Sequence, residues 1–172
     1  MASDEDDNDL DSRLAKVRAR MKRLENIHTK SADKFSQTLD ELVKLKGEEE
    51  ALLIIKKIVV DAFTRIVERT PVDTGRARAG WQFEVGKAQA WTPPEGIYDA
   101  LKDAETKRAI KAAVEDELKR IREASPEALW IISNHLDYIG ALEAGWSKQA
   151  PSGMVAITLQ ELRRRLAKKY SL

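Results

Sequence analysis

The sequence predicts an α+β fold, in which a small sheet packs against a long helix in the N-terminal half of the chain and a second helix at its C-terminus. Three observations predict it. Over residues 52–66, apolar side chains recur every three or four positions, which is typical of one face of a helix. Residues 81–85 alternate apolar and polar side chains, as a half-buried strand does. Over residues 155–166, four apolar side chains share one face of a terminal helix.

The composition indicates a soluble globular protein with one domain and an appendage. Its 172 residues are 42% hydrophobic and 34% charged, with a formal net charge of +1. No apolar run reaches the ~18–20 residues that span a bilayer, and the acidic start lacks the positive charge of a secretory signal. The absence of cysteine excludes disulfides, thiolate metal sites and cysteine nucleophiles. The near-neutral charge argues against a surface built as a whole for nucleic acid.

The first 34 residues divide into two segments of opposite charge. Residues 1–12 hold six carboxylates and two aliphatic side chains, so we expect a disordered acidic tail. Residues 13–23 hold six bases and no acid, with apolar residues at helical spacing between them. This pattern predicts an amphipathic helical arm whose basic face is solvated, touches nucleic acid or docks on a partner. The bases considered for such contacts are Arg13, Arg18, Arg20, Lys22 and Arg23.

We expect residues 35–172 to form a single α+β domain. Its first helix begins between residues 35 and 39, has a possible break at Gly47 and ends at Thr70, because Pro71 disfavours helical geometry in the residue before it. The apolar stripe of this helix is broad. Such breadth implies burial on more than one side, by a sheet or by a neighbouring subunit.

The segment 70–81, TPVDTGRARAGW, has two interpretations. It contains the Asp-Thr-Gly tripeptide that carries the catalytic carboxylate of aspartic proteases, but such a site needs two carboxylates that share a proton. The sequence holds one copy, and the neighbouring Arg76 would keep Asp73 ionised. A helix-to-strand turn accounts for more residues, since Asp73 or Thr74 can bond to backbone donors ahead of it and Gly75 supplies permissive dihedral angles. We therefore expect a turn, followed by one helical turn before Trp81 opens the strand.

Three further elements are expected in the middle of the chain. Residues 91–96 read as a loop, and about 99–123 as a helical insertion that is charged on most sides. The short run 129–132 is rich in β-formers and long enough for one strand.

The last third of the chain predicts two helices. A short one spans 134–145, with Asn134 as its cap and Gly145 in a left-handed conformation at its end. The C-terminal helix begins after a cap at either Ser152 or Thr158. The later start would leave the four residues before it as a short strand.

The sequence offers little support for catalysis or metal binding. His28 and His135 have no evident second ligand, no phosphate-binding glycine pattern occurs, and no serine lies in a nucleophile-elbow context. We therefore predict that the chain is not an enzyme and binds no cofactor or metal.

Two features of the sequence indicate contacts with partners. The last helix carries five bases that form either a solvated face or a surface for DNA or an acidic partner: Arg163, Arg164, Arg165, Lys168 and Lys169. The tryptophans differ in their expected roles. Trp81 and Trp130 fall in predicted strands and belong to the core, whereas Trp91 and Trp146 fall in or beside loops and suit interface anchors.

Two blocks of the sequence together resemble the tail-completion or neck proteins of long-tailed bacteriophages, the family that includes the minor tail protein Z of lambda-like phages. The first block is Val72, Asp73, Thr74, Gly75 and Arg76 with Trp81. The residues of the second block are Asn134, Tyr138, Glu143, Gly145, Trp146, Lys148, Gln149, Pro151 and Met154. The resemblance covers about 52–166, and the insertion at 99–123 is longer than in compact members of the family.

The resemblance implies a structural virion protein. It would form a homo-oligomeric ring, usually a hexamer, at the head-proximal end of the tail, after a stage in the host cytoplasm. It would contact the tail terminator or tail tube and the head connector, and genomic DNA would pass through its lumen without sequence-specific contacts; no membrane is implied. The alternative is a DNA-binding accessory protein that uses 13–23 or 163–169, for which tight, strongly salt-dependent binding to duplex DNA would be the sign.

Overall fold

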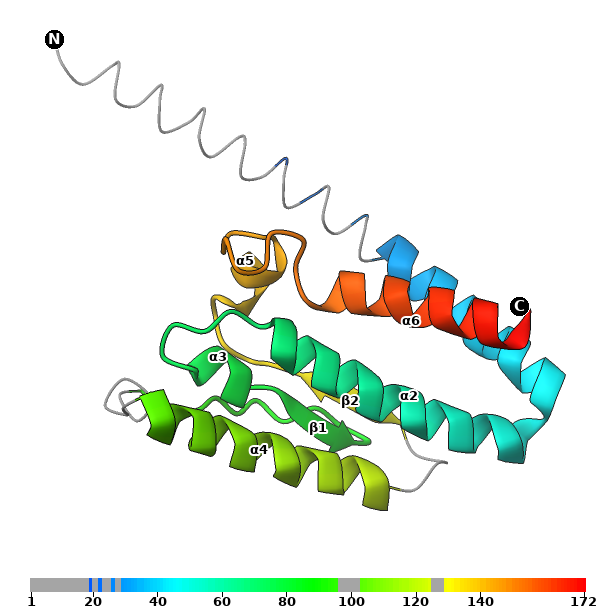
Figure 1. Cartoon of the computed structure of the whole chain (residues 1–172), viewed down its shortest axis with the longest axis horizontal. Coiled ribbons are helices and arrows are strands. Elements are labelled where there is room, and N and C mark those ends of the chain that lie inside the picture. Colours follow the sequence, from blue (N-terminus) through cyan, green and yellow to red (C-terminus); the bar gives the residue numbers. More distant parts are fainter. Residues whose placement is uncertain (1–18, 20–21, 23–25, 27–28, 96–102, 125–128) are drawn as a thin grey trace, which may run out of the picture.

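The computed structural model describes residues 19, 22, 26, 29–95, 103–124 and 129–172. A helix over 29–46 is followed by α2 (Glu48–Arg69), α3 (Arg76–Ala79), β1 (Gln82–Val85), α4 (Asp103–Glu123), β2 (Trp130–Ser133), α5 (Ile139–Glu143) and α6 (Val155–Tyr170) (Figure 1). This order confirms the α+β class. In the residues so described, no helix combines the length and the apolar character needed to cross a membrane.

The N-terminal predictions fall largely outside the described residues. The acidic tail lies outside them, as do Arg13, Arg18, Arg20 and Arg23 of the basic arm, whereas Lys22 is helical and exposed. The helix over 29–46 crosses the expected domain boundary at residue 35, and its Ser31 is buried and accepts a hydrogen bond from Gln160 of α6 (3.2 Å). The packed domain therefore begins before residue 35.

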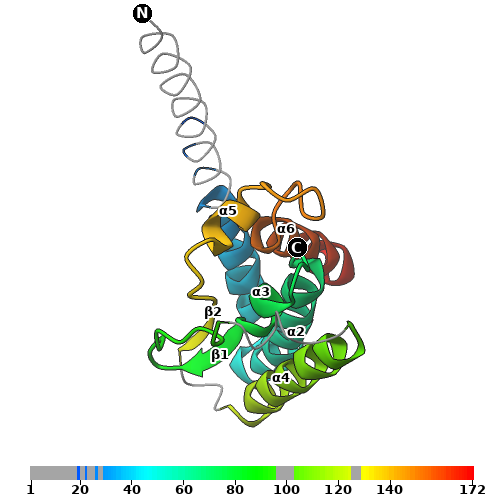
Figure 2. The ribbon, with the colours of Figure 1, turned by 90° about the vertical axis from the view of Figure 1, so that its left-hand side faces the viewer.

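The helix over 29–46, α2 and α6 lie side by side (Figures 1 and 2). The first helix and α6 are parallel, because Ser31 contacts Gln160 near their starts and Lys46 lies 5.7 Å from the centroid of the Tyr170 ring near their ends. The predicted break at Gly47 is confirmed: its φ of 76° reverses the chain into α2. The buried apolar residues between these helices are Leu42, Ile58, Ala62, Leu162 and Leu166.

Charged side chains also join α2 to α6. Arg65 and Arg69 of α2 both bind one carboxylate oxygen of Glu161 (3.1 and 2.7 Å), and Arg165 of α6 binds Asp61 (2.5 Å). The hydrogen bond from Arg65 to Asp61 (2.7 Å) raises the pKa of the Arg65 guanidinium. Apart from the exposed Arg165, these side chains are only partly exposed, so the network they form helps to fix how α6 sits along α2.

The other side of α2 packs against the sheet and α4. One cluster joins buried residues from these elements and from the loop before α6: Phe63, Ile66, Val67, Trp81, Phe83, Ile121, Ala150 and Met154. The broad stripe of α2 is thus covered on both sides by elements of its own chain. The burial of α2 therefore requires no neighbouring subunit, and the breadth of the stripe is no argument for one.

The two strands are antiparallel, with Gln82 opposite Ser133 and Val85 opposite Trp130. The expected alternation along β1 is wrong, because the polar Gln82 and Glu84 are both buried and Val85 is half exposed. The loop after β1 causes this difference. Its residue 89 donates a backbone hydrogen bond to Glu84, and Ser133 donates another (2.6 Å), so the polar face of the strand is enclosed.

The helical insertion contributes to the core rather than standing apart from it. Its described part, α4, places Ile121 in the cluster against α2, and its Glu117 accepts a hydrogen bond from the backbone N–H of Phe83 (2.7 Å). This contact satisfies a donor at the free edge of the sheet. The predicted start at residue 99 lies outside the described residues.

Candidate functional site

The turn after α2 is built around Thr70. Its hydroxyl donates to the carbonyl of Ile66 (2.7 Å) and accepts the indole N–H of Trp81 (2.7 Å), which holds the turn against the start of β1. Thr70 is extended (φ −66°, ψ 126°), so the predicted helix end before Pro71 is confirmed. Trp81 is buried, as predicted for a core residue, although β1 begins one residue after it.

The rest of the turn follows the prediction in its backbone. Gly75 has a φ of 95°, a left-handed conformation that residues with a side chain rarely adopt. The hydroxyl of Thr74 accepts the N–H of Arg76 (3.3 Å), and α3 supplies the single helical turn that was expected. Arg78 donates to the carbonyls of Glu68 and Thr70 (2.8 and 2.7 Å), and burial lowers the pKa of its guanidinium.

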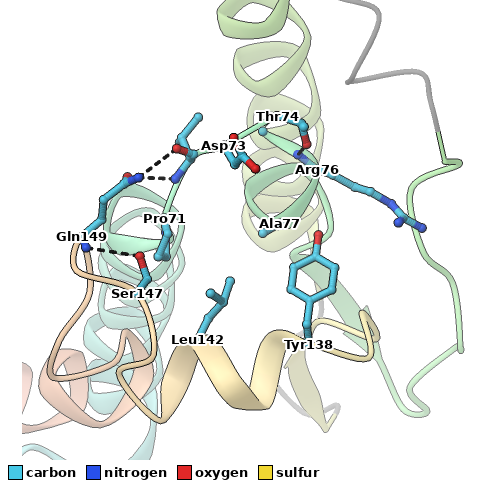
Figure 3. A pocket seen from close by; sticks show the side chains of 11 residues that line it. Pro71, Asp73, Thr74, Arg76, Ala77, Tyr138, Leu142, Ser147 and Gln149 are labelled. Atoms are coloured by element: carbon cyan, nitrogen blue, oxygen red, sulfur yellow. Dashed lines mark hydrogen bonds between the residues drawn. The ribbon is translucent and has the colours of Figure 1, made fainter.

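Arg76, whose charge was expected to keep Asp73 ionised, makes its hydrogen bond and its ion pair with other residues. Arg76 donates to the carbonyl of Pro93 (2.9 Å) and pairs with Glu95 (3.3 Å), so its side chain points away from the turn (Figure 3). Asp73 is exposed, and within the described part of the chain no hydrogen bond or ion pair engages its carboxylate. The loop that follows β1 attracts Arg76 because it supplies both a carbonyl and a carboxylate.

Gln149 joins the second sequence block to the first. Its side-chain amide donates to the carbonyl of Val72 (2.9 Å), and its side-chain oxygen accepts the N–H of Val72 (3.0 Å), although the two residues are 77 positions apart. The hydroxyl of Ser147 accepts the backbone N–H of Gln149 (3.2 Å), which orients this loop (Figure 3). The side-chain amide of Gln149 thus pairs with the backbone of Val72 as a residue of a neighbouring β-strand would, and this fixes the distance between the blocks.

Asn134 makes a second link, but it does not cap a helix as predicted. The helix α5 begins at Ile139, after Tyr138, and is shorter than expected. The side chain of Asn134 instead accepts the N–H of Leu136 (3.2 Å) and donates to the carbonyl of Ala77 in α3 (2.9 Å). These two bonds hold the chain in a turn over α3, which delays the helix.

Gly145 follows α5 with a φ of 75°, so the predicted left-handed position at the end of that helix is confirmed. The start of α6 agrees with neither predicted cap. The helix begins at Val155, so the residues before Thr158 are helical and form no strand. Glu143 provides the cap: its carboxylate accepts the N–H groups of Met154, Val155 and Ala156 (2.6, 2.9 and 3.0 Å). This placement of an anion at a helix start is favourable, because the free N–H groups and the helix dipole are positive there.

Gly153 lets the loop approach Glu143 closely. Its φ is 75°, and a Cβ atom on it would lie 2.4 Å from the carbonyl oxygen of Glu143. The sequence did not indicate the role of Glu143, because no spacing rule links a carboxylate to a helix that begins twelve residues later. One feature of the sequence does indicate a distant cap. Gly153 precedes an apolar helix start that has no polar residue of its own to accept the free N–H groups.

The two blocks enclose a groove of about 360 Å³. Its lining residues are Pro71, Val72, Asp73, Thr74, Gly75, Arg76, Ala77, Tyr138, Leu142, Ser147 and Gln149. Pro71, Ala77 and Leu142 contribute apolar surface, whereas Asp73 and Tyr138 are exposed at the opening (Figure 3). As predicted from their loops, Trp146 and Trp91 are exposed too, with 55% and 47% of their surface accessible.

The other residues of the second block are divided between surface and interior. Lys148 and Pro151 are exposed in the loop beside the groove. Gly145 follows α5 in its left-handed conformation, and Met154 is fully buried in the core, so both help to shape the loop. The block therefore combines exposed residues beside the groove with residues that shape the loop.

The bases of the last helix lie on α6, away from the groove. Arg165 pairs with Asp61, and Arg163 is half-buried, whereas Arg164, Lys168 and Lys169 are exposed. They occupy the part of α6 near the C-terminus, and the groove lies at the α3 and α5 end of the molecule (Figure 1).

Three ionisable side chains line the groove, those of Asp73, Arg76 and Tyr138. Asp73 is the one carboxylate that lines it, and in the described ranges no three His, Cys, Asp or Glu side chains are placed to hold a metal ion. Comparison with models of protein families, with curated proteins and with solved structures finds no match to this chain.

Proposed function

We propose that this chain is a structural protein of a phage virion, at the head-proximal end of the tail. One observation carries the proposal: the two sequence blocks that resemble tail-completion proteins meet in one surface, joined by the two hydrogen bonds between Val72 and Gln149. Two segments that resembled the family by chance would have no physical reason to lie together in the fold. Two segments that form one interface would have to lie together.

The groove supports a protein as the partner at this surface. Interface anchors are commonly aromatic side chains that surround a concave apolar area and are held in place by the fold. Tyr138 and Trp146 expose 41% and 55% of their surface beside the groove, and Asp73 adds an uncompensated carboxylate. The partner surface should therefore offer a basic side chain next to an apolar one.

The proposed assembly is a ring formed in the particle, in which neighbouring copies and a tail terminator, tail tube or head connector protein share these contacts. Six copies are expected from the resemblance alone. Genomic DNA would pass through the lumen, where contacts to phosphates without base reading suffice. The exposed aromatic residues, rather than the apolar stripe of α2, support contact with neighbours.

The protease interpretation gains no support from the site. Two carboxylates must share a proton in that mechanism, and Asp73 has no second carboxylate beside it in the groove. A homodimer would have to bring two exposed turns together, each at the rim of a groove rather than on a strand-built framework. We therefore propose a binding role for Asp73.

Electron microscopy of phage particles that encode this chain tests the proposal. An antibody against the chain, coupled to gold, should label the junction between head and tail. A particle that assembles with Trp146→Ala should show less label, whereas Lys111→Ala on the exposed face of α4 should leave the label unchanged. Label on the capsid shell or the tail tip, or its absence from particles, would refute the proposal.

A further inference from the structure

A second groove, of about 200 Å³, runs between α2 and α6. Its floor is apolar and consists of the half-buried Ile54 of α2 with the outer edges of three residues of the core between the helices, Ile58, Leu162 and Leu166. Its rim is basic, because Lys57 and Lys169 stand on either side. An apolar floor between two cationic edges fits a peptide that carries an aliphatic side chain among carboxylates.

The positive charge of this rim is largely uncompensated. Arg165 is paired with Asp61, but across the described ranges no carboxylate pairs with Lys57, Arg164 or Lys168. Lys169 lies 5.1 Å from the centroid of the Tyr170 ring, a contact that leaves its charge available. The end of α6 thus carries an excess of positive charge beside the apolar floor.

The chain itself contains the complementary peptide. Residues 4–11, DEDDNDLD, hold six carboxylates and one large aliphatic side chain, Leu10. We propose that this acidic segment of one copy docks in the groove of a second copy. Leu10 occupies the apolar floor, and the flanking Asp9 and Asp11 face Lys57 and Lys169.

The direction of the chain favours a second copy over the same one. The helix over 29–46 starts beside Gln160 and runs parallel to α6, so the chain enters this layer at the start of α6, while the groove includes Lys169 near its end. The groove extends from Leu162 to Tyr170 along α6, and its far end at Lys169 is ~22 Å along the helix axis from the contact between Ser31 and Gln160, given the rise of the helix from residue 31 to residue 46.

The apolar floor distinguishes this partner from nucleic acid. A phosphate backbone would satisfy the basic rim but would make no use of the apolar surface that Ile54 presents at the floor. A contact from the tail of one copy to the groove of the next is head-to-tail, and such contacts close into rings or extend into filaments. The inference goes beyond the proposed function, because it identifies how copies of the chain contact one another.

Cross-linking of the full chain tests the inference. The chain has no cysteine, so single introduced cysteines report the contact without background. Copies with Asn8→Cys are mixed under mild oxidation with copies with Leu53→Cys, an exposed residue one turn before Lys57. The heterodimer yield should exceed by about tenfold that obtained with Lys111→Cys on α4, because docking raises the effective concentration of the two thiols. High salt should lower this excess.

A charge exchange makes the test specific. Lys57→Glu with Lys169→Glu in the groove copy should abolish the excess, and Asp9→Lys with Asp11→Lys in the tail copy should restore it, with unchanged helical circular dichroism as the check on folding. Three results would overturn the inference: equal yields at residues 53 and 111, no restoration by the exchange, or a disulfide that forms only within one chain carrying both cysteines. Duplex DNA binding that requires Lys57 and Lys169, without the cross-link, would assign the groove to nucleic acid instead. All of these measurements use purified chain, so their failure is distinct from a failure of particle labelling.

Discussion

Replacing Glu143 with alanine removes the carboxylate that accepts the N–H groups of Met154, Val155 and Ala156 at the start of α6. A hydrogen bond to a charged group contributes about 1.5–3 kcal/mol, and loss of a helix cap alone costs about 0.5–2 kcal/mol. The three bonds share one acceptor and do not add independently. We therefore expect Glu143→Ala to lower the free energy of unfolding by about 3 kcal/mol.

Urea denaturation followed by circular dichroism measures this change. Glu143→Gln keeps a carbonyl acceptor at the same position and loses the charge, so it should cost about half as much as the alanine variant. Glu115→Ala is a matched control, because Glu115 makes an exposed pair with Lys111 (3.7 Å) whose loss should change stability by less than about 0.5 kcal/mol. A loss below about 1 kcal/mol for Glu143→Ala would refute the assignment of this carboxylate as the cap of α6.

Further predictions concern the loop, the turn and the charged surface. Gly153→Ala should lower the free energy of unfolding by more than about 3 kcal/mol, since it adds a steric clash with Glu143 to an unfavourable φ. Gly47→Ala has nearly the same φ but open space around the Cβ position, so it should cost about 1–2 kcal/mol, and equal losses in urea denaturation would contradict the clash. Gln149→Ala should speed hydrogen exchange at the Val72 amide and cost about 1 kcal/mol, and an unchanged exchange rate would show that the two blocks are not joined there. Fluorescence anisotropy should detect weak binding to duplex DNA at about 0.15 M salt, and tight binding with a steep salt dependence would favour the DNA-binding accessory protein.

Features fixed by neighbouring residues could be predicted from the sequence. Pro71 identified the end of α2, and the glycines at 47 and 75 identified two changes of chain direction, because each acts through its own backbone dihedral angles. The broad apolar stripe of α2 correctly indicated burial on more than one side. The partners of that stripe could not be identified, since periodicity shows which face is buried and not what covers it.

Features fixed by distant residues could not be predicted. Glu84 reads as the solvent-facing residue of an alternating strand, but the loop after β1 and Ser133 supply hydrogen bonds that allow its burial. Asn134 reads as a helix cap, but the carbonyl of Ala77 lies within reach of its amide. In both cases the local pattern was overridden by a contact that forms only in the folded chain.

The candidate site shows the same division. The turn at Asp73 was predicted from its own residues, and the exposure of Trp146 was predicted from its loop. The groove itself depends on the two bonds between Val72 and Gln149, which no local rule connects. Sequence reasoning therefore found the two halves of the surface, and the fold brings them together.

A cryo-electron microscopy reconstruction of the head-to-tail junction of the phage particle that encodes this chain tests the central claim most directly. The account predicts a ring at the head-proximal end of the tail into which α2, α4, α6 and the two-stranded sheet fit as one body, with the groove beside Asp73 in contact with a neighbouring protein. A junction whose density is fully explained by other proteins, or a ring in which this groove faces solvent, would contradict it.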